Sequence, residues 1–72
     1  MLVLSRLYDK RYTLMDRLAV LEGEWLDLEL EGEERGFSDE LEEEVMNAFR
    51  KMRDIEARLE KVEELLDRLE RE

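Results

Sequence analysis

The chain has 72 residues, with 22 acidic and 12 basic side chains and a net charge of −10. It contains no cysteine and no histidine, which excludes disulfides and the zinc, haem and iron–sulfur sites built from thiolate or imidazole ligands. A chain this short buries a marginal core and needs a disulfide, a metal or association as support. We therefore expect it to associate and to bind no cofactor.

Charged residues make up 47% of the chain and apolar residues 43%, a mixture typical of long helices and coiled coils. Nine arginines against three lysines, with one asparagine and no glutamine, give a thermophile-like composition. The apolar run at residues 1–4 is too short for a signal peptide or a membrane span. We expect a soluble, cytoplasmic protein without membrane contact.

The first predicted helix covers about residues 2–31. Its apolar residues recur at alternating spacings of four and three, which is typical of a helix that packs along a partner helix. This stripe, called the seam below, consists of Leu4, Leu7, Leu14, Leu18, Leu21, Trp25 and Leu28, and Arg11 occupies its one position that is not apolar. A second apolar stripe lies beside the seam and contains Tyr8, Tyr12, Met15, Ala19 and Leu26. The combined surface is wider than one partner helix requires.

Arg11 has two interpretations. In the first, Arg11 has a functional role. It is either a buried or register-setting charge that pairs with Glu56, Glu60 or Glu63, or an exposed cation that binds a ligand. Alternatively, its stem packs in the seam while its guanidinium group reaches water. We favour the second interpretation.

Residues 32–38 contain two glycines in a polar run and predict the loop. Gly32 is the expected residue after the end of the first helix, and Ser38 the expected N-cap of the second. The second helix covers about residues 38–71. Its seam is unbroken and consists of Leu41, Val45, Ala48, Met52, Ile55, Leu59, Val62, Leu66 and Leu69.

A short loop makes the two helices antiparallel neighbours. With the loop centred near Arg35, residues whose numbers sum to about 70 face each other. Leu14 then meets Ile55, and nearly every seam position meets another. The sequence therefore predicts an all-α fold, an antiparallel two-helix hairpin resembling a coiled coil, as a single domain. We find no residue motif that ties the chain to a known family.

Apolar residues outside the seam predict a further contact, because a large exposed apolar stripe marks a binding surface. The expected partner or dimer interface comprises Tyr8, Tyr12, Met15, Ala19, Leu26, Met46, Phe49 and Leu65. A twofold dimer that forms a four-helix bundle is the simplest solution. A different protein partner is the alternative.

The loop end is strongly acidic, since residues 22–44 hold twelve carboxylates and one arginine. This charge argues against nucleic-acid binding, which needs a basic surface. It is a solvated surface, a docking surface for an unidentified basic protein or a binding site for a divalent metal ion. The candidate docking residues are Glu31, Glu33, Glu34, Asp39, Glu40 and Glu43.

An enzyme is not expected. No nucleophile has a recognisable activating base, and no glycine-rich phosphate loop is present. Spacings such as Glu40-x-x-Glu43 superficially resemble magnesium sites of all-helical nucleotide pyrophosphohydrolases, but chance produces them in a chain this acidic. We expect a non-enzymatic interaction module, namely an adaptor, regulator or assembly component that acts as a homodimer. The alternatives are an acidic inhibitor or nucleic-acid mimic that binds a basic groove and, behind it, a divalent-metal-dependent hydrolase.

Overall fold

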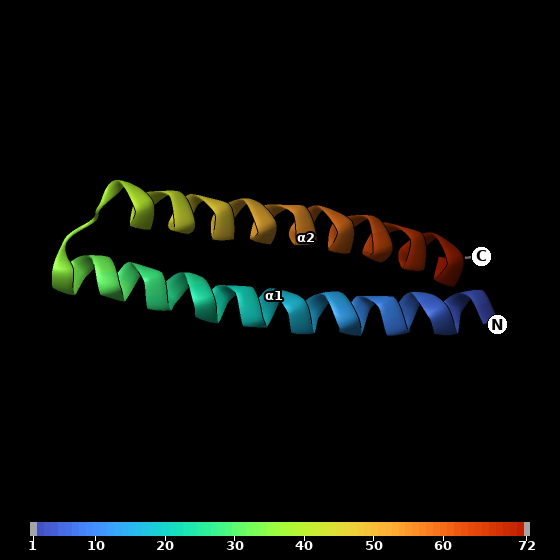
Figure 1. Ribbon diagram of the computed structural model, residues 1–72. Helices are drawn as coiled ribbons and strands as arrows, with labels where there is room; N and C mark the ends of the chain where they lie inside the picture. The colour runs from blue at the N-terminus through green and yellow to red at the C-terminus, as the bar shows by residue number, and fades with distance from the viewer. Residues whose placement is uncertain (1, 72) are drawn as a thin grey trace.

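The computed structural model describes residues 2–71, which form two α-helices joined by a three-residue connection (Figure 1). α1 spans Leu2–Arg35 and α2 spans Asp39–Arg71. The helices run antiparallel, side by side, in a hairpin 53 Å long and 14 Å across in both other directions. The predicted all-α helical hairpin is confirmed.

The seam forms the core between the helices. A buried cluster contains Leu14, Ile55, Leu59, Val62 and Leu66, and Leu4, Leu7, Leu18 and Leu21 pack against it. Leu41 and Ala48 are buried nearer the loop, and Trp25, Leu28, Val45 and Met52 are half-buried. Of the seam leucines, Leu69 at the open end is exposed. The alternating spacing thus identified the residues that hold the hairpin together.

The end of α1 differs from the prediction. The helix continues past residue 31 to Arg35, and the residue that follows it is Gly36 rather than Gly32. Gly36 has a φ of 86°, a left-handed conformation that glycine adopts without a steric penalty. Its N–H donates to the carbonyl of Gly32 at 2.8 Å, which closes the last turn. Both glycines satisfy the sequence rule for a helix end, but only Gly36 has the required backbone conformation.

Gly32 instead serves packing. It continues the seam four residues beyond Leu28 and is buried. A Cβ atom at Gly32 would overlap three atoms of the Phe37 ring, so the absence of a side chain lets that ring fold back onto α1. The connection is therefore held against the helix by an aromatic contact.

Ser38 caps α2 as predicted. Its hydroxyl oxygen accepts a hydrogen bond from the N–H of Leu41 at 3.1 Å, which satisfies a donor that the first helical turn leaves unpaired. Asp39, Glu40 and Glu42 lie in this turn, where carboxylates interact favourably with the helix dipole. The start of α2 is thus fixed by local chemistry.

The register is displaced from the one expected. The connection at residues 36–38 is centred on Phe37, so residues whose numbers sum to about 74, rather than 70, face each other. The contact between Arg11 and Glu63 agrees with this register. The error follows from the misplaced end of α1, since a loop centre that moves by two residues shifts the facing residue by four.

Candidate functional site

The seam divides the surface of the hairpin into two long flanks. In α1, Tyr8 and Met15 directly follow seam positions, whereas Lys10 and Arg17 directly precede them. Residues seven apart lie on one side of a helix, so the members of each pair share a side. The residue after a seam position and the residue before one lie on opposite sides of the seam, so the two pairs belong to opposite flanks. We name the first the aromatic flank; it contains Tyr8, Tyr12, Met15, Ala19 and Leu26 of α1 and Met46 and Phe49 of α2, all of them exposed. We name the other the Val20 flank.

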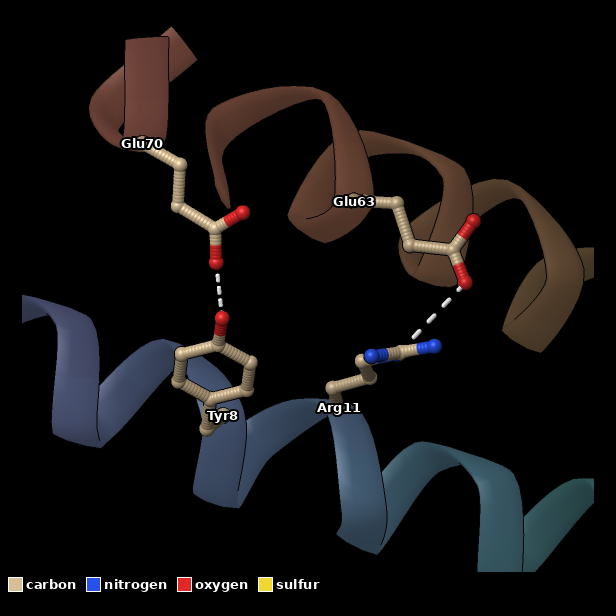
Figure 2. Close-up of polar contacts among 4 residues, drawn as sticks. All are labelled: Tyr8, Arg11, Glu63 and Glu70. Carbon is tan, nitrogen blue, oxygen red and sulfur yellow. Dashed lines mark hydrogen bonds and ion pairs between the residues drawn. The ribbon is translucent and has the colours of Figure 1, made fainter. Parts of the chain in front are cut away.

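At the open end of the aromatic flank, Tyr8 connects the two helices. Its hydroxyl donates a hydrogen bond to Glu70 (Figure 2). This hydrogen bond is the main reason why the pKa of Tyr8 is raised above 10, and desolvation and the negative charge of Glu70 act in the same direction. Tyr8 is therefore held in place by α2 while its side chain stays partly exposed to solvent.

Arg11 lies one turn further along, between the seam and the aromatic flank. Its Nε atom is 3.7 Å from Oε1 of Glu63 (Figure 2), which is an ion pair but too long for a hydrogen bond. The Nε atom is buried without a hydrogen-bond partner, whereas the side chain as a whole is partly exposed. Arg11 thus packs its stem in the seam and directs its charge towards one of the three acids considered from the sequence.

Near the loop, α2 contributes the aromatic and methionine side chains of the aromatic flank. The guanidinium carbon of Arg53 lies 5.9 Å from the centroid of the Phe49 ring, within the range of a cation–π contact. A groove of about 340 Å³ is lined by Phe37, Glu42, Val45 and Met46. The ring of Phe37 therefore contributes both to the loop contact with Gly32 and to this groove.

Carboxylates surround the apolar residues of the aromatic flank. By the same seven-residue spacing, the positions of this flank carry ten acids and one arginine, Arg53, within residues 2–71, and Arg11 reaches the flank from its seam position. The acids are Glu22, Glu29, Glu33, Asp39, Glu42, Glu56, Glu60, Glu63, Asp67 and Glu70. Nearly all of the net charge of the chain therefore lies on one side of the hairpin.

The Val20 flank has a different composition. Val20 and Leu65 are exposed on it, and two grooves expose parts of the core between the helices. One, of about 360 Å³, is lined by Asp16, Arg17, Val20, Leu21 and Ile55. The other, of about 310 Å³, is lined by Leu7, Lys10, Arg58, Lys61, Val62 and Leu65. The repeat positions that form this flank carry seven cations and seven acids within the described residues, so their charges sum to zero; Asp16, at the flank's outer edge, is not one of them.

The structure separates the residues predicted to form one interface. Seven of the eight lie on the aromatic flank, whereas Leu65 lies in a groove of the Val20 flank. The six predicted acidic docking residues are all exposed around the loop end. Glu31 among them pairs with Arg35 at 3.8 Å. These six are distributed around the hairpin and do not form one face.

The prediction from sequence missed Val20 and the charge pattern of its flank. The distribution of charge along consecutive stretches of the chain shows an acidic loop end but no difference between the flanks. Counting by position in the seven-residue repeat would have found that difference, because the repeat assigns each residue to a side of the helix.

Two further properties bear on function. Among residues 2–71, no group of three or more carboxylates is arranged to hold a metal ion. Neither α1 nor α2 combines the length and the apolar character needed to cross a membrane.

Comparisons with protein-family models, with curated proteins and with solved structures found no match.

Proposed function

We propose that the protein is a non-enzymatic protein–protein interaction module, an adaptor, regulator or assembly component, that acts as a homodimer of hairpins in a four-helix bundle. One observation carries this proposal: large apolar side chains are exposed on both flanks, although the seam already joins the helices to each other. Apolar surface that the hairpin does not bury is available to partners. We propose the cytoplasm as its compartment, because a chain without cysteine needs no oxidising environment.

The aromatic flank suits a protein partner with apolar and basic residues. Its aromatic and methionine side chains provide adaptable apolar contacts. Its ten carboxylates attract cations and repel acidic competitors. An amphipathic helix with lysine or arginine beside its apolar stripe combines both features, and a hairpin groove accepts such a helix lengthwise. We propose a segment of this kind as the ligand of the aromatic flank.

A synthetic amphipathic helix of leucine and lysine tests this proposal, with the same peptide carrying glutamate in place of lysine as its control. We expect the lysine peptide to bind and the glutamate peptide not to bind, measured by calorimetry. The double variant Tyr12→Glu, Met15→Glu should abolish binding, because it places charges in the apolar stripe. Equal binding of both peptides would contradict the proposed role of the carboxylates.

A second candidate function is an acidic inhibitor or nucleic-acid mimic that occupies a basic groove. The observation that favours it is the exposed acidic loop end, which includes Glu33, Glu34 and Glu43. Competition with nucleic acid for a basic nucleic-acid-binding protein is the appropriate test. Changing these three residues to glutamine should weaken an inhibitor, whereas Tyr12→Glu should weaken it much less. The opposite ranking would indicate binding through the aromatic flank.

A further inference from the structure

The charges of the Val20 flank are separated along the hairpin. At the repeat positions of this flank, the half near the open end carries six cations, and Asp16 reaches its edge at the groove beside Val20. The cations are Arg6, Lys10, Arg17, Arg58, Lys61 and Arg68. The half near the loop carries six acids: Glu24, Asp27, Glu31, Glu34, Glu40 and Glu44. Lys51 and Asp54 lie between these halves. The flank is therefore neutral as a whole, with opposite charges at its two ends.

We propose that this flank is the surface by which two copies of the chain associate, with their hairpins antiparallel about a twofold axis across the middle of the flank. This inference rests on the dimer proposed above and specifies its surface and direction. In the antiparallel arrangement, the basic half of each copy faces the acidic half of the other. In a parallel arrangement, cations would face cations and acids would face acids.

The symmetry determines which helices meet. A twofold axis that lies between the flanks and crosses their long direction packs α1 against α1 of the second copy, and α2 against α2. The midpoint of Leu2–Arg35 lies near residue 18, which places Val20 close to the axis. Lys10 then faces Asp27 of the partner subunit, and Arg6 faces Glu31 of the partner subunit. Each of these contacts occurs twice in the dimer.

The apolar part of the flank supports this arrangement. Val20 lines one groove together with the core residues Leu21 and Ile55. Leu65 lines the other groove together with Leu7 and Val62. The 53 by 14 Å outline of the hairpin corresponds to a flank of roughly 700 Å², close to the ~800 Å² per partner of a standard protein interface. The same association through the aromatic flank would bring two sets of ten carboxylates together, which is repulsive.

Two variants with nearly equal exposure distinguish the flanks. Val20 is 62% exposed and Tyr12 is 66% exposed, and neither is part of the buried cluster. Light scattering after size exclusion should show that Val20→Glu dissociates the dimer, whereas Tyr12→Glu leaves it intact. Circular dichroism establishes that both variants stay helical. Loss of the dimer with Tyr12→Glu but not with Val20→Glu would overturn the inference and leave the proposed dimer standing.

Charge reversal tests whether the two hairpins of the dimer are antiparallel, and this test does not depend on folding. Lys10→Glu and Asp27→Lys should each weaken the dimer about tenfold, because each creates two like-charge contacts. The double variant should regain most of the affinity. Lys10 and Asp27 are about 25 Å apart within one helix, beyond the ~8 Å screening length at physiological salt, so the recovery must arise between copies. Additive losses in the double variant would contradict the antiparallel contact.

Distances between spin labels provide an independent measurement, since the chain has no cysteine of its own. Labels at Glu34→Cys, near the loop, should be separated by nearly the 53 Å length of the hairpin. Labels at Ala57→Cys, near mid-length, should lie close together and serve as the control. A short distance at Glu34→Cys would establish a parallel dimer and overturn this inference alone. A monomer at tens of micromolar would overturn the proposed dimer as well.

Discussion

The two flanks of the hairpin share one core and similar exposure of apolar residues, yet they differ in charge. Tyr12 and Val20 are exposed to nearly the same extent. The positions of the aromatic flank, which includes Tyr12, carry ten carboxylates and one arginine along the length of the hairpin, whereas those of the Val20 flank carry equal numbers of both signs, separated lengthwise. We therefore propose that the exposed apolar side chains of each flank contact a partner and that the surrounding charges select which partner.

This difference has a consequence for a small acidic protein. A chain with a net charge of −10 repels its own copies at long range. Association becomes feasible where local charges cancel, and the Val20 flank provides such a surface. The remaining acids are left on the aromatic flank, where they can select a basic partner. Self-association and partner binding are thus proposed for opposite sides of one hairpin.

The largest expected effect comes from the core that supports both flanks. Leu14 is 3% exposed in the buried cluster, and Leu14→Ala should lower the free energy of unfolding by about 2–4 kcal/mol. That loss is comparable to the whole stability of a domain this small, so binding through both flanks should fail together. The control is Met15→Ala, at a neighbouring residue that is 45% exposed. Denaturant unfolding should show a much smaller change for Met15→Ala, and equal losses would contradict the assigned core.

Two glycines allow stability to be changed without altering either flank. Gly23 lies on the outer side of α1 with open space at its Cβ position, so Gly23→Ala should stabilise the helix by about 1 kcal/mol. Gly36→Ala should destabilise the hairpin by about 1–2 kcal/mol, because its φ of 86° strains a residue that has a Cβ. Thermal melting should show shifts of opposite sign, whereas peptide binding by the folded variants should match that of the native chain. A stabilising Gly36→Ala would show that the turn tolerates a side chain.

The sequence was sufficient for the fold because the seam repeats without interruption in the second helix. Period, spacing and a short polar loop together require two antiparallel helices. The loop was located less accurately, since both Gly32 and Gly36 satisfy the rule for a helix end. The choice between them depends on packing, because Gly32 is needed under the Phe37 ring, and glycine positions alone do not reveal that contact.

The sequence predicts which apolar residues lie outside the seam, but it does not by itself divide them between two flanks. The apolar stripe from Tyr8 to Leu26 is exposed, as its position beside the seam requires. Leu65 also lies outside the seam, and the sequence pattern therefore assigns it to the same surface; the structure places it on the other side of the seam, in a groove of the Val20 flank. The charge pattern on Lys10 and Arg17 was likewise present in the sequence, and it becomes meaningful once each residue is assigned to a side.

Replacing Arg11 tests whether the stability of the hairpin depends on the ion pair between this cation and an acid of the aromatic flank. Arg11→Leu should leave the free energy of unfolding within about 1 kcal/mol of the native value or raise it, because a partly exposed ion pair contributes little and leucine completes the seam. Glu63→Gln, which removes the other partner of the pair, should have an equally small effect. Chemical unfolding of both variants provides the measurement. A loss of several kcal/mol in either would show that this pair holds the two helices in register.

The smallest expected effect concerns the free energy of unfolding of the hairpin at alkaline pH. The hydrogen bond to Glu70 raises the pKa of Tyr8 in the folded chain above its ordinary value of about 10. The folded state therefore holds this proton more tightly than the unfolded state, and the resulting stability is complete below pH 10 and is lost as the pH rises through the raised pKa. Tyr8→Phe should remove this part of the alkaline decline, whereas Tyr12→Phe, on the same flank, should retain it. Identical unfolding curves above pH 10 for the two variants would indicate that Tyr8 is not bound to α2. Tyr8 would then be as free as Tyr12 to contact a partner, and the surface available on the aromatic flank would extend to the open end of the hairpin.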